Sequence, residues 1–300
     1  MPEAEAAWRR NNAGHLLFIA NARFMRDKLD HVHTHGFPDL GNAVLTLLLN
    51  VDPAGTRPGT IAARMGLGKS SVAELLRRAE RTHLLVRASD PADSRAALMR
   101  LTDQGEAALE AAKAAIAAAQ SRFIASTGAP FADAFRRQIG SYAADLAGSI
   151  GRPEQWHQEN IGRVLSLGAR RFVTEVLAIV HQRGHCDIGE AQLGLIRHLD
   201  MAGTRLTEVA DRAGMTKQSM RELVDRCQDL GLVERAADET DSRAKIIRFT
   251  PLGLSMLEDM RRGVLQAEER LMQRIGKDLL GQMRHALPAY AQAERVTPAP

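Results

Sequence analysis

The sequence is poor in the features that mark secreted, membrane-spanning or disulfide-stabilised proteins. Its 300 residues include two cysteines, Cys186 and Cys227, which cannot build a disulfide framework and which favour a reducing compartment. No run approaches the roughly 18 apolar residues needed to span a membrane. The opening residues, MPEAEAAWRRNN, lack the apolar core of a signal peptide. These absences predict a soluble, cytoplasmic protein.

Signs of catalysis are scarce as well. The sequence has no glycine-rich phosphate-binding loop, no nucleophile elbow and no pair of carboxylates arranged for acid–base chemistry. It therefore predicts no enzyme, no catalytic residue and no cofactor. Aromatic residues make up 4% of the chain, whereas alanine and leucine are abundant, which favours helices. The net charge of +4 permits a nucleic-acid partner without requiring one.

The chain contains an internal repeat. Residues 61–105 align with residues 209–253 without a gap, and roughly 19 of these 45 positions are identical, far beyond chance. The register continues upstream, because Ala-Gly-Thr-Arg occurs at 54–57 and again at 202–205. The sequence therefore predicts two copies of one domain.

The boundary between the copies is predicted near 149–153, a Gly/Pro-containing stretch typical of a linker. The two domains are then residues 1–150 and residues 151–300. The hydrophobic content of 45% is enough to give each a modest core.

Each copy has the pattern of a helix-turn-helix. In the second copy, residues 207–213 read as the first helix, and Gly214 lies at the turn, where a left-handed backbone costs glycine little. Thr216 can then cap the second helix. The first copy places Gly66 at the equivalent turn and Lys69 at the start of its second helix.

Apolar helices are predicted before this motif, and a β-hairpin and long helices after it. A periodic helix opens each copy, and a short apolar helix follows, closed by the Ala-Gly-Thr-Arg turn. β-Branched and aliphatic runs around a charged tip predict a hairpin, or wing. The long C-terminal helices exceed what a winged core needs, and their natural use is dimerisation. The predicted fold class is mainly α with small β wings. The expected ranges are short helices at 45–49 and 193–196, strands at 84–87, 98–101, 232–235 and 245–249, and long helices at 106–126, 130–149, 254–275 and 277–293.

The predicted wing of the second copy resembles the wing motif of the MarR family. That motif reads G-L-V-x-R, then an Asp-rich tip ending in D-x-R, then a strand closing in L-T-x-x-G. The second copy gives Gly231-Leu232-Val233-Glu234-Arg235, then Asp238, Asp241 and Arg243, then Phe249-Thr250-Pro251-Leu252-Gly253. The first copy keeps Asp90, Asp93, Arg95, Leu101, Thr102 and Gly105, but has His83 where the family usually has glycine, so the first wing strand is expected to start less tightly there.

The resemblance, which extends twice over nearly the whole chain, implies a winged helix-turn-helix transcription regulator. Members of the family are usually homodimers of about half this length, joined by their terminal helices. Here both protomers would lie in one chain as an intramolecular pseudo-dimer on double-stranded DNA. The family also implies a small-molecule effector in the crevice between the terminal helices and the winged core.

The predicted DNA contacts come from the recognition helices and the wings. A recognition helix presents its N-terminal residues to base edges in the major groove, where Lys and Arg suit guanine or phosphate and Gln218 suits adenine. Arg95 and Arg243 at the wing tips would reach the minor groove or the backbone, and Lys245 would add a phosphate contact. The predicted DNA-binding residues are Lys69, Ser70, Ser71, Arg95, Lys217, Gln218, Ser219, Arg221, Arg243 and Lys245. Because the two recognition helices differ, we expect an asymmetric or imperfectly palindromic site.

Histidines and cysteines give weaker signals. His31 and His35 share a helical face, but only His33 and His181 occupy matching positions, so solvated histidines are favoured over a metal site. Cys227 aligns with Ala79, and a buried thiol is favoured over a sensing one. No metal is predicted.

The leading interpretation is an effector-responsive repressor. The alternative is a protein-interaction adaptor whose winged helices no longer read DNA; such a protein should lose basic residues at its reading heads, yet both copies keep a lysine and a wing arginine. A metal- or thiol-dependent enzyme would require the irregular His/Cys cluster to converge in space.

Overall fold

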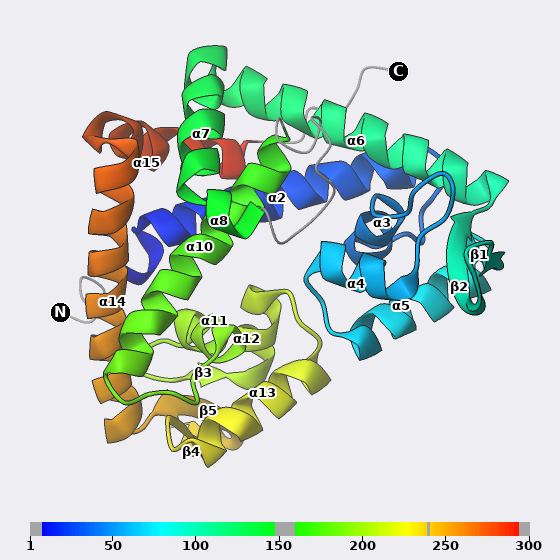
Figure 1. Cartoon of the computed structure of the whole chain (residues 1–300). Helices are drawn as coiled ribbons and strands as arrows, with labels where there is room; N and C mark the ends of the chain where they lie inside the picture. Colours follow the sequence, from blue (N-terminus) through cyan, green and yellow to red (C-terminus); the bar gives the residue numbers. More distant parts are fainter. Residues whose placement is uncertain (1–7, 148–159, 239–240, 294–300) are drawn as a thin grey trace. The chain divides into compact units, whose positions relative to one another are not determined.

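The computed structural model describes residues 8–147, 160–238 and 241–293 (Figure 1). It confirms a mainly helical fold with small antiparallel sheets. The first half contains α2 (Ala13–Thr34), α3 (Asn42–Leu48), α4 (Pro58–Met65), α5 (Lys69–Arg81), β1 (Leu85–Asp90), β2 (Asp93–Leu101), α6 (Asp103–Thr127), α7 (Ala129–Tyr142) and α8 (Ala144–Ala147). The second half contains α10 (Ile161–Gln182), α11 (Glu190–His198), β3 (Thr204–Arg205), α12 (Leu206–Ala213), α13 (Lys217–Asp229), β4 (Val233–Asp238), β5 (Asp241–Phe249), α14 (Pro251–Ile275) and α15 (Lys277–Gln292).

The chain divides into two compact units, and neither is one continuous half of the sequence. One unit comprises Met1–Leu16 with Ala169–Gly276, and the other comprises Leu17–Gly168 with Lys277–Pro300. Each unit holds one helix-turn-helix and one wing together with a segment from the other half of the chain. The linker expected at 149–153 lies outside the described residues, so the boundary between residues 1–150 and 151–300 stays a prediction.

Both helix-turn-helix motifs form where they were predicted. Gly66 ends α4 with φ 63° and ψ 31°, and Gly214 ends α12 with φ 63° and ψ 30°. This left-handed conformation is the reason that glycine stands at both turns. Thr216 caps α13 as predicted, because its hydroxyl accepts a hydrogen bond from the amide of Ser219 at 3.1 Å.

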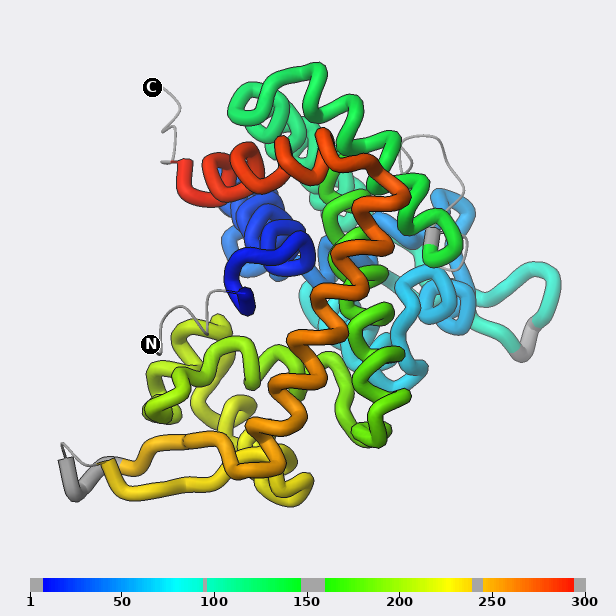
Figure 2. Tube along the Cα trace, turned by 90° about the vertical axis from the view of Figure 1, so that its left-hand side faces the viewer, coloured from blue at the N-terminus to red at the C-terminus, as the bar shows by residue number. Residues whose placement is uncertain are grey.

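The wings are longer than predicted. β1 and β2 pair from Leu85↔Leu101 to Asp90↔Asp93, and β4 and β5 pair from Val233↔Phe249 onward. The polar stretches expected as loops are therefore mostly strand, since antiparallel pairing satisfies the backbone whatever the side chains are. Figure 2 shows the β4–β5 wing as a long two-stranded ribbon.

The Ala-Gly-Thr-Arg segments also differ from the prediction. Instead of a turn alone, the second one contributes β3, whose Thr204 pairs with Ile247 of β5. In the first copy, the amide of Thr56 donates to the carbonyl of Met99 at 3.0 Å, and the amide of Met99 donates back at 2.9 Å. Sequence periodicity could not reveal a pairing that spans some forty residues.

The long helices match their expected ranges with one correction. α6, α14 and α15 lie where they were predicted, whereas the helix expected over 130–149 ends at Tyr142 and is followed by the short α8; residues 148 and 149 lie outside the described part. α6 and α14 are each capped by a threonine, Thr102 and Thr250. At Gly105 and Gly253 in their first turns, an added Cβ would overlap the main-chain carbonyl of Leu84 or Leu232. Only glycine fits there, because the helix starts against the first wing strand.

His83 is the one described non-glycine residue with a positive φ, 54°, and Gly231 at the matching position has φ 69°. A left-handed backbone costs a residue with a Cβ about 1–2 kcal/mol. The residue that departs from the MarR-like pattern therefore holds a conformation that favours glycine.

We predict that His83→Gly raises the free energy of unfolding by about 0.5–1 kcal/mol, the relief of strain minus the extra entropy of an unfolded glycine. The reverse change, Gly231→Ala, should lower it by about 1 kcal/mol. Urea unfolding followed by circular dichroism measures both, and a destabilised His83→Gly variant would contradict the strain argument.

Candidate nucleic-acid interface

The recognition helices α5 and α13 are each anchored by one apolar face. α5 buries Val72, Leu76 and Ala79, and α13 buries Met220, Val224 and Cys227. Because these residues lie on the inner face, the opposite face of the first turn of each helix is turned outward. The predicted residues on that turn are all exposed: Lys69, Ser70 and Ser71 on α5, and Lys217, Gln218, Ser219 and Arg221 on α13.

The two outward turns differ in their hydrogen bonds. On α13, the Thr216 hydroxyl donates to the Ser219 hydroxyl at 2.9 Å, and the Gln218 amide donates to the Glu222 carboxylate at 2.8 Å. Gln218 would have to leave Glu222 before it could pair with adenine. At the start of α5, Gly68 occupies the cap position and offers no side chain.

The wing residues are placed in part. Lys245 is exposed on β5, opposite Ala237 of β4. Arg95 and Arg243 belong to β2 and β5, but their side chains lie outside the described residues. Their predicted contacts with the minor groove remain predictions.

A pair of ion bridges that the sequence analysis missed ties each wing to its helix-turn-helix. Arg57, the N-cap residue of α4, places Nε 2.7 Å and Nη2 2.6 Å from one carboxylate oxygen of Asp90 at the end of β1. Arg205, the N-cap residue of α12, holds Asp238 of β4 at 2.8 and 2.7 Å. All four residues are identical at matching positions of the repeat, a signal that could have identified them.

The electrostatics of the first bridge favour the ionised carboxylate. Asp90 is buried, and its Oδ1 accepts a hydrogen bond from the amide of Ala92 at 2.9 Å. That amide first, and then Arg57, lower the pKa of Asp90 below its ordinary value. The bridge is therefore fully formed at neutral pH.

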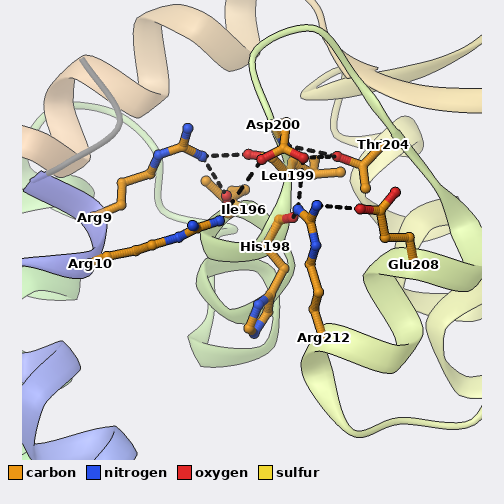
Figure 3. Close-up of polar contacts among 9 residues, drawn as sticks. All are labelled: Arg9, Arg10, Ile196, His198, Leu199, Asp200, Thr204, Glu208 and Arg212. Atoms are coloured by element: carbon orange, nitrogen blue, oxygen red, sulfur yellow. Dashed lines mark hydrogen bonds and ion pairs between the residues drawn. The ribbon is translucent and has the colours of Figure 1, made fainter. Parts of the chain in front are cut away.

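A second polar network lies at the base of each helix-turn-helix. Arg64 of α4 donates to Asp52 at 2.8 Å and to the carbonyl of Asn50 at 3.0 Å. Arg212 of α12 donates in the same way to Asp200 at 2.8 Å and to the carbonyl of His198 at 3.0 Å (Figure 3). These contacts fix the first helix of each motif to the turn that precedes it.

Leu67 and Met215 are exposed apolar residues that the sequence analysis did not single out. Each follows the left-handed glycine of its turn, and they are 43% and 38% exposed. Each therefore stands beside the outward turn of a recognition helix, where a large apolar side chain is unusual.

The histidines and cysteines have local structural contacts. The ring Nε2 of His33 lies 2.8 Å from the carbonyl of Leu40, and that of His181 lies 2.7 Å from the carbonyl of Ile188, so the matching pair closes the same loop. Cys227 is fully buried as predicted, and burial raises the pKa of its thiol to about 11. Within the described part of the chain, no three His, Cys, Asp or Glu side chains gather as metal ligands, and no helix is long and apolar enough to cross a membrane.

A family model matches part of the chain. Residues 187–244 match the model of the MarR family, and this stretch contains α11, β3, α12, α13, β4 and the first residues of β5. No curated protein matches the chain.

Several solved structures resemble about half of the chain. CouR from Rhodococcus jostii RHA1, in a structure bound to p-coumaroyl-CoA, is 25% identical over 48% of this chain and 100% of its own, with a TM-score of 0.40. CouR bound to a 23-mer DNA duplex is 24% identical over 43% of this chain and 90% of its own, with a TM-score of 0.36. BpsR from Bordetella bronchiseptica, whose DNA binding is regulated by 6-hydroxynicotinic acid, is 20% identical over 48% of this chain and 100% of its own, with a TM-score of 0.37.

We predict that Asp90→Asn lowers the stability of the chain at neutral pH and flattens its loss in acid. The folded pKa of Asp90 is lowered, so its carboxylate stabilises the fold above its unfolded pKa of about 3.9, and this contribution is lost as pH falls through the folded value. Unfolding midpoints measured from pH 7 to pH 2.5 test this, with Glu110→Gln on the exposed face of α6 as the control. If the unfolding midpoints of the wild-type chain and of Asp90→Asn fall in parallel as the pH is lowered, the ionisation of Asp90 does not contribute to stability.

Proposed function

We propose that the chain is a transcriptional repressor that reads duplex DNA with two non-identical winged helix-turn-helix modules. The observation that carries this proposal is the exposed first turn of α5 and of α13. Both turns begin with a lysine and are held outward by a buried apolar face. A helix presented in this way, beside a wing, suits insertion into the major groove.

The tandem arrangement is part of the proposal. Contacts that recur at positions matched by the sequence repeat support it, above all Arg57–Asp90 with Arg205–Asp238 and Arg64–Asp52 with Arg212–Asp200. Residues 1–150 and 151–300 would be the two copies, and together they would form an intramolecular pseudo-dimer on one DNA site. The MarR family match to residues 187–244 covers the second reading module.

The two modules would read different sequences. α5 offers Lys69, Ser70 and Ser71, whereas α13 offers Lys217, Gln218, Ser219 and Arg221. Lysine and arginine suit guanine or phosphate, and Gln218 suits adenine once it leaves Glu222. Arg95 and Arg243 would contact the minor groove or the backbone, and Lys245 a phosphate.

A small-molecule effector completes the proposal, and the family resemblance carries this part. The similar structures include one bound to p-coumaroyl-CoA and one concerned with 6-hydroxynicotinic acid. Effector binding would change the affinity of the chain for DNA.

Lys69→Ala and Lys217→Ala should each weaken binding to a selected operator and lower the slope of log K against log salt by about 1. Lys277→Ala removes an exposed lysine at the start of α15 and serves as the charge-matched control. Binding is measured on duplexes enriched from a random pool, across a salt series, and the enriched site should be asymmetric.

Two outcomes would contradict the proposal. Binding that stays at the weak nonspecific level favours the adaptor interpretation. A perfectly inverted operator would contradict the claim that the modules read different sequences.

Leu67 and Met215 provide a second test at the same interface. An exposed apolar side chain beside the recognition helix suits the 5-methyl group of thymine. Replacing thymines of the operator by deoxyuridine should weaken binding of the wild-type chain but have less effect on the Leu67→Ala or Met215→Ala variant that lost the contact. Additive effects of the two changes would show that these side chains do not touch a thymine methyl group.

A further inference from the structure

Arg9 lies in the first half of the sequence, yet it is buried within the compact unit that holds the second helix-turn-helix. The residue is 5% exposed, and its guanidinium donates to two main-chain carbonyls, that of Leu199 at 2.6 Å and that of Ile196 at 3.2 Å. Figure 3 shows Arg9 and Arg10 reaching this loop from one side, with Arg212 reaching it from α12. Arg9 therefore satisfies carbonyl groups at the C-terminal end of α11.

Among the described residues, groups close in sequence hold the end of the equivalent helix in the first copy: the Asn50 side chain donates to the carbonyl of Thr46 at 2.8 Å, and Arg64 donates to the carbonyl of Asn50 at 3.0 Å. After α3, the amide of Asn50 donates to the carbonyl of Leu47 at 2.9 Å, and the amide of Val51 donates to the carbonyl of Leu48 at 3.1 Å. α11 instead runs on to His198, and Leu199 turns away in an extended conformation with φ −83° and ψ 132°. A helix end leaves carbonyls that need donors, and at α11 side chains supply them.

The segment that carries Arg9 is itself held in place. The Asn12 side chain donates to the carbonyls of Trp8 and Arg9 at 2.8 and 3.1 Å, and its oxygen accepts from the amide of His15 at 2.9 Å. The amide of Ala13 donates to Glu268 of α14 at 3.0 Å. Residues 8–13 are thus fixed both to the start of α2 and to α14.

From the end of α11 the contacts continue into the reading module. Asp200 binds Arg212 at 2.8 Å, and its amide donates to the hydroxyl of Thr204 at 2.8 Å. Thr204 belongs to β3, which pairs with the wing strand β5, and Arg212 belongs to α12 and also binds Glu208. The loop that Arg9 contacts is therefore connected both to α12, through Arg212, and to the wing, through Thr204.

We infer that Arg9 is a positioning residue for the second DNA-reading module, although the chain places it in the first half. The inference rests on the proposed function and adds to it a dependence of the second module on a segment from the first half of the sequence. The residue at the matching place of the second half is His157, outside the described residues. Residues 8–13 would set the angle at which α12 and the wing present α13.

The test uses full-length Arg9→Ala, Arg9→Lys and Arg10→Ala. Arg10 is the matched control, because it is a neighbouring arginine whose side chain is 66% exposed and whose contact with Asp200 is 3.9 Å. Footprinting on the selected operator assigns its half-sites by the losses in Lys69→Ala and Lys217→Ala. Arg9→Ala should weaken the half-site that depends on Lys217 about tenfold, as expected for hydrogen bonds from a charged donor, and leave the other nearly unchanged. Arg9→Lys keeps a donor and should restore part of the loss.

A second measurement needs no DNA. Amide hydrogen exchange should show lost protection at the end of α11 and in α12 for Arg9→Ala, with α4 and α5 unchanged. Equal weakening of both half-sites, exchange that rises throughout the chain, or an Arg10→Ala variant that behaves like Arg9→Ala would each overturn the inference. If the wild-type chain binds no DNA, the proposed function fails, and the claim that Arg9 positions a reader fails with it. Hydrogen exchange then still shows whether Arg9 holds the α11–α12 loop.

Discussion

An ion bridge joins the first helix of each helix-turn-helix to the far end of its wing, and it sets the direction of the wing together with the strand pairing of Thr56 and Thr204. A two-stranded hairpin is marginally stable alone and has no fixed direction. Arg57 and Arg205 stand at the N-termini of α4 and α12, and each meets a carboxylate at the far end of the first wing strand. Because an N-cap residue moves with its helix, the wing follows the helix-turn-helix as one body. In each bridge two guanidinium nitrogens contact the same carboxylate oxygen, which restrains the direction of the side chain as well as the distance.

Some contacts recur at matching positions of the two halves of the chain, and others occur in one half alone among the described residues. The residues that build the scaffold recur in both halves, as in the left-handed Gly66 and Gly214 and the threonine caps of α6 and α14. The residues that would touch a partner differ, as do the helix ends behind them. The end of α3 is held by groups close to it in sequence, whereas the end of α11 also receives hydrogen bonds from Arg9. The residues that recur are therefore those that the fold requires.

Local chemistry explains which features could be predicted from the sequence. The helix-turn-helix motifs, their glycine turns, the Thr216 cap and the long helices follow from residue spacing and backbone preference, and the structure contains them where they were predicted. The third strand β3, the length of the wings and the end of α7 were missed because they depend on pairing partners distant in sequence. The Arg57–Asp90 bridge was within reach, since the repeat preserves both residues. The contacts of Arg9 could not be predicted, because its partners are main-chain carbonyls almost two hundred residues away. Every residue has a main-chain carbonyl, so residue type does not show which one is bound.

The tight contact of Gly105 with Leu84 and of Gly253 with Leu232 has a mechanical consequence. Each long helix starts in direct contact with the main chain at the beginning of a wing, and no side chain lies between them. At 1.5 Å per residue, a helix such as α14 is a lever roughly 37 Å long that pivots at this joint. A small tilt imposed anywhere along the lever therefore has to turn the wing or break the joint. One methyl group added at either glycine would push the long helix away from the wing, so these glycines keep the two elements in direct contact.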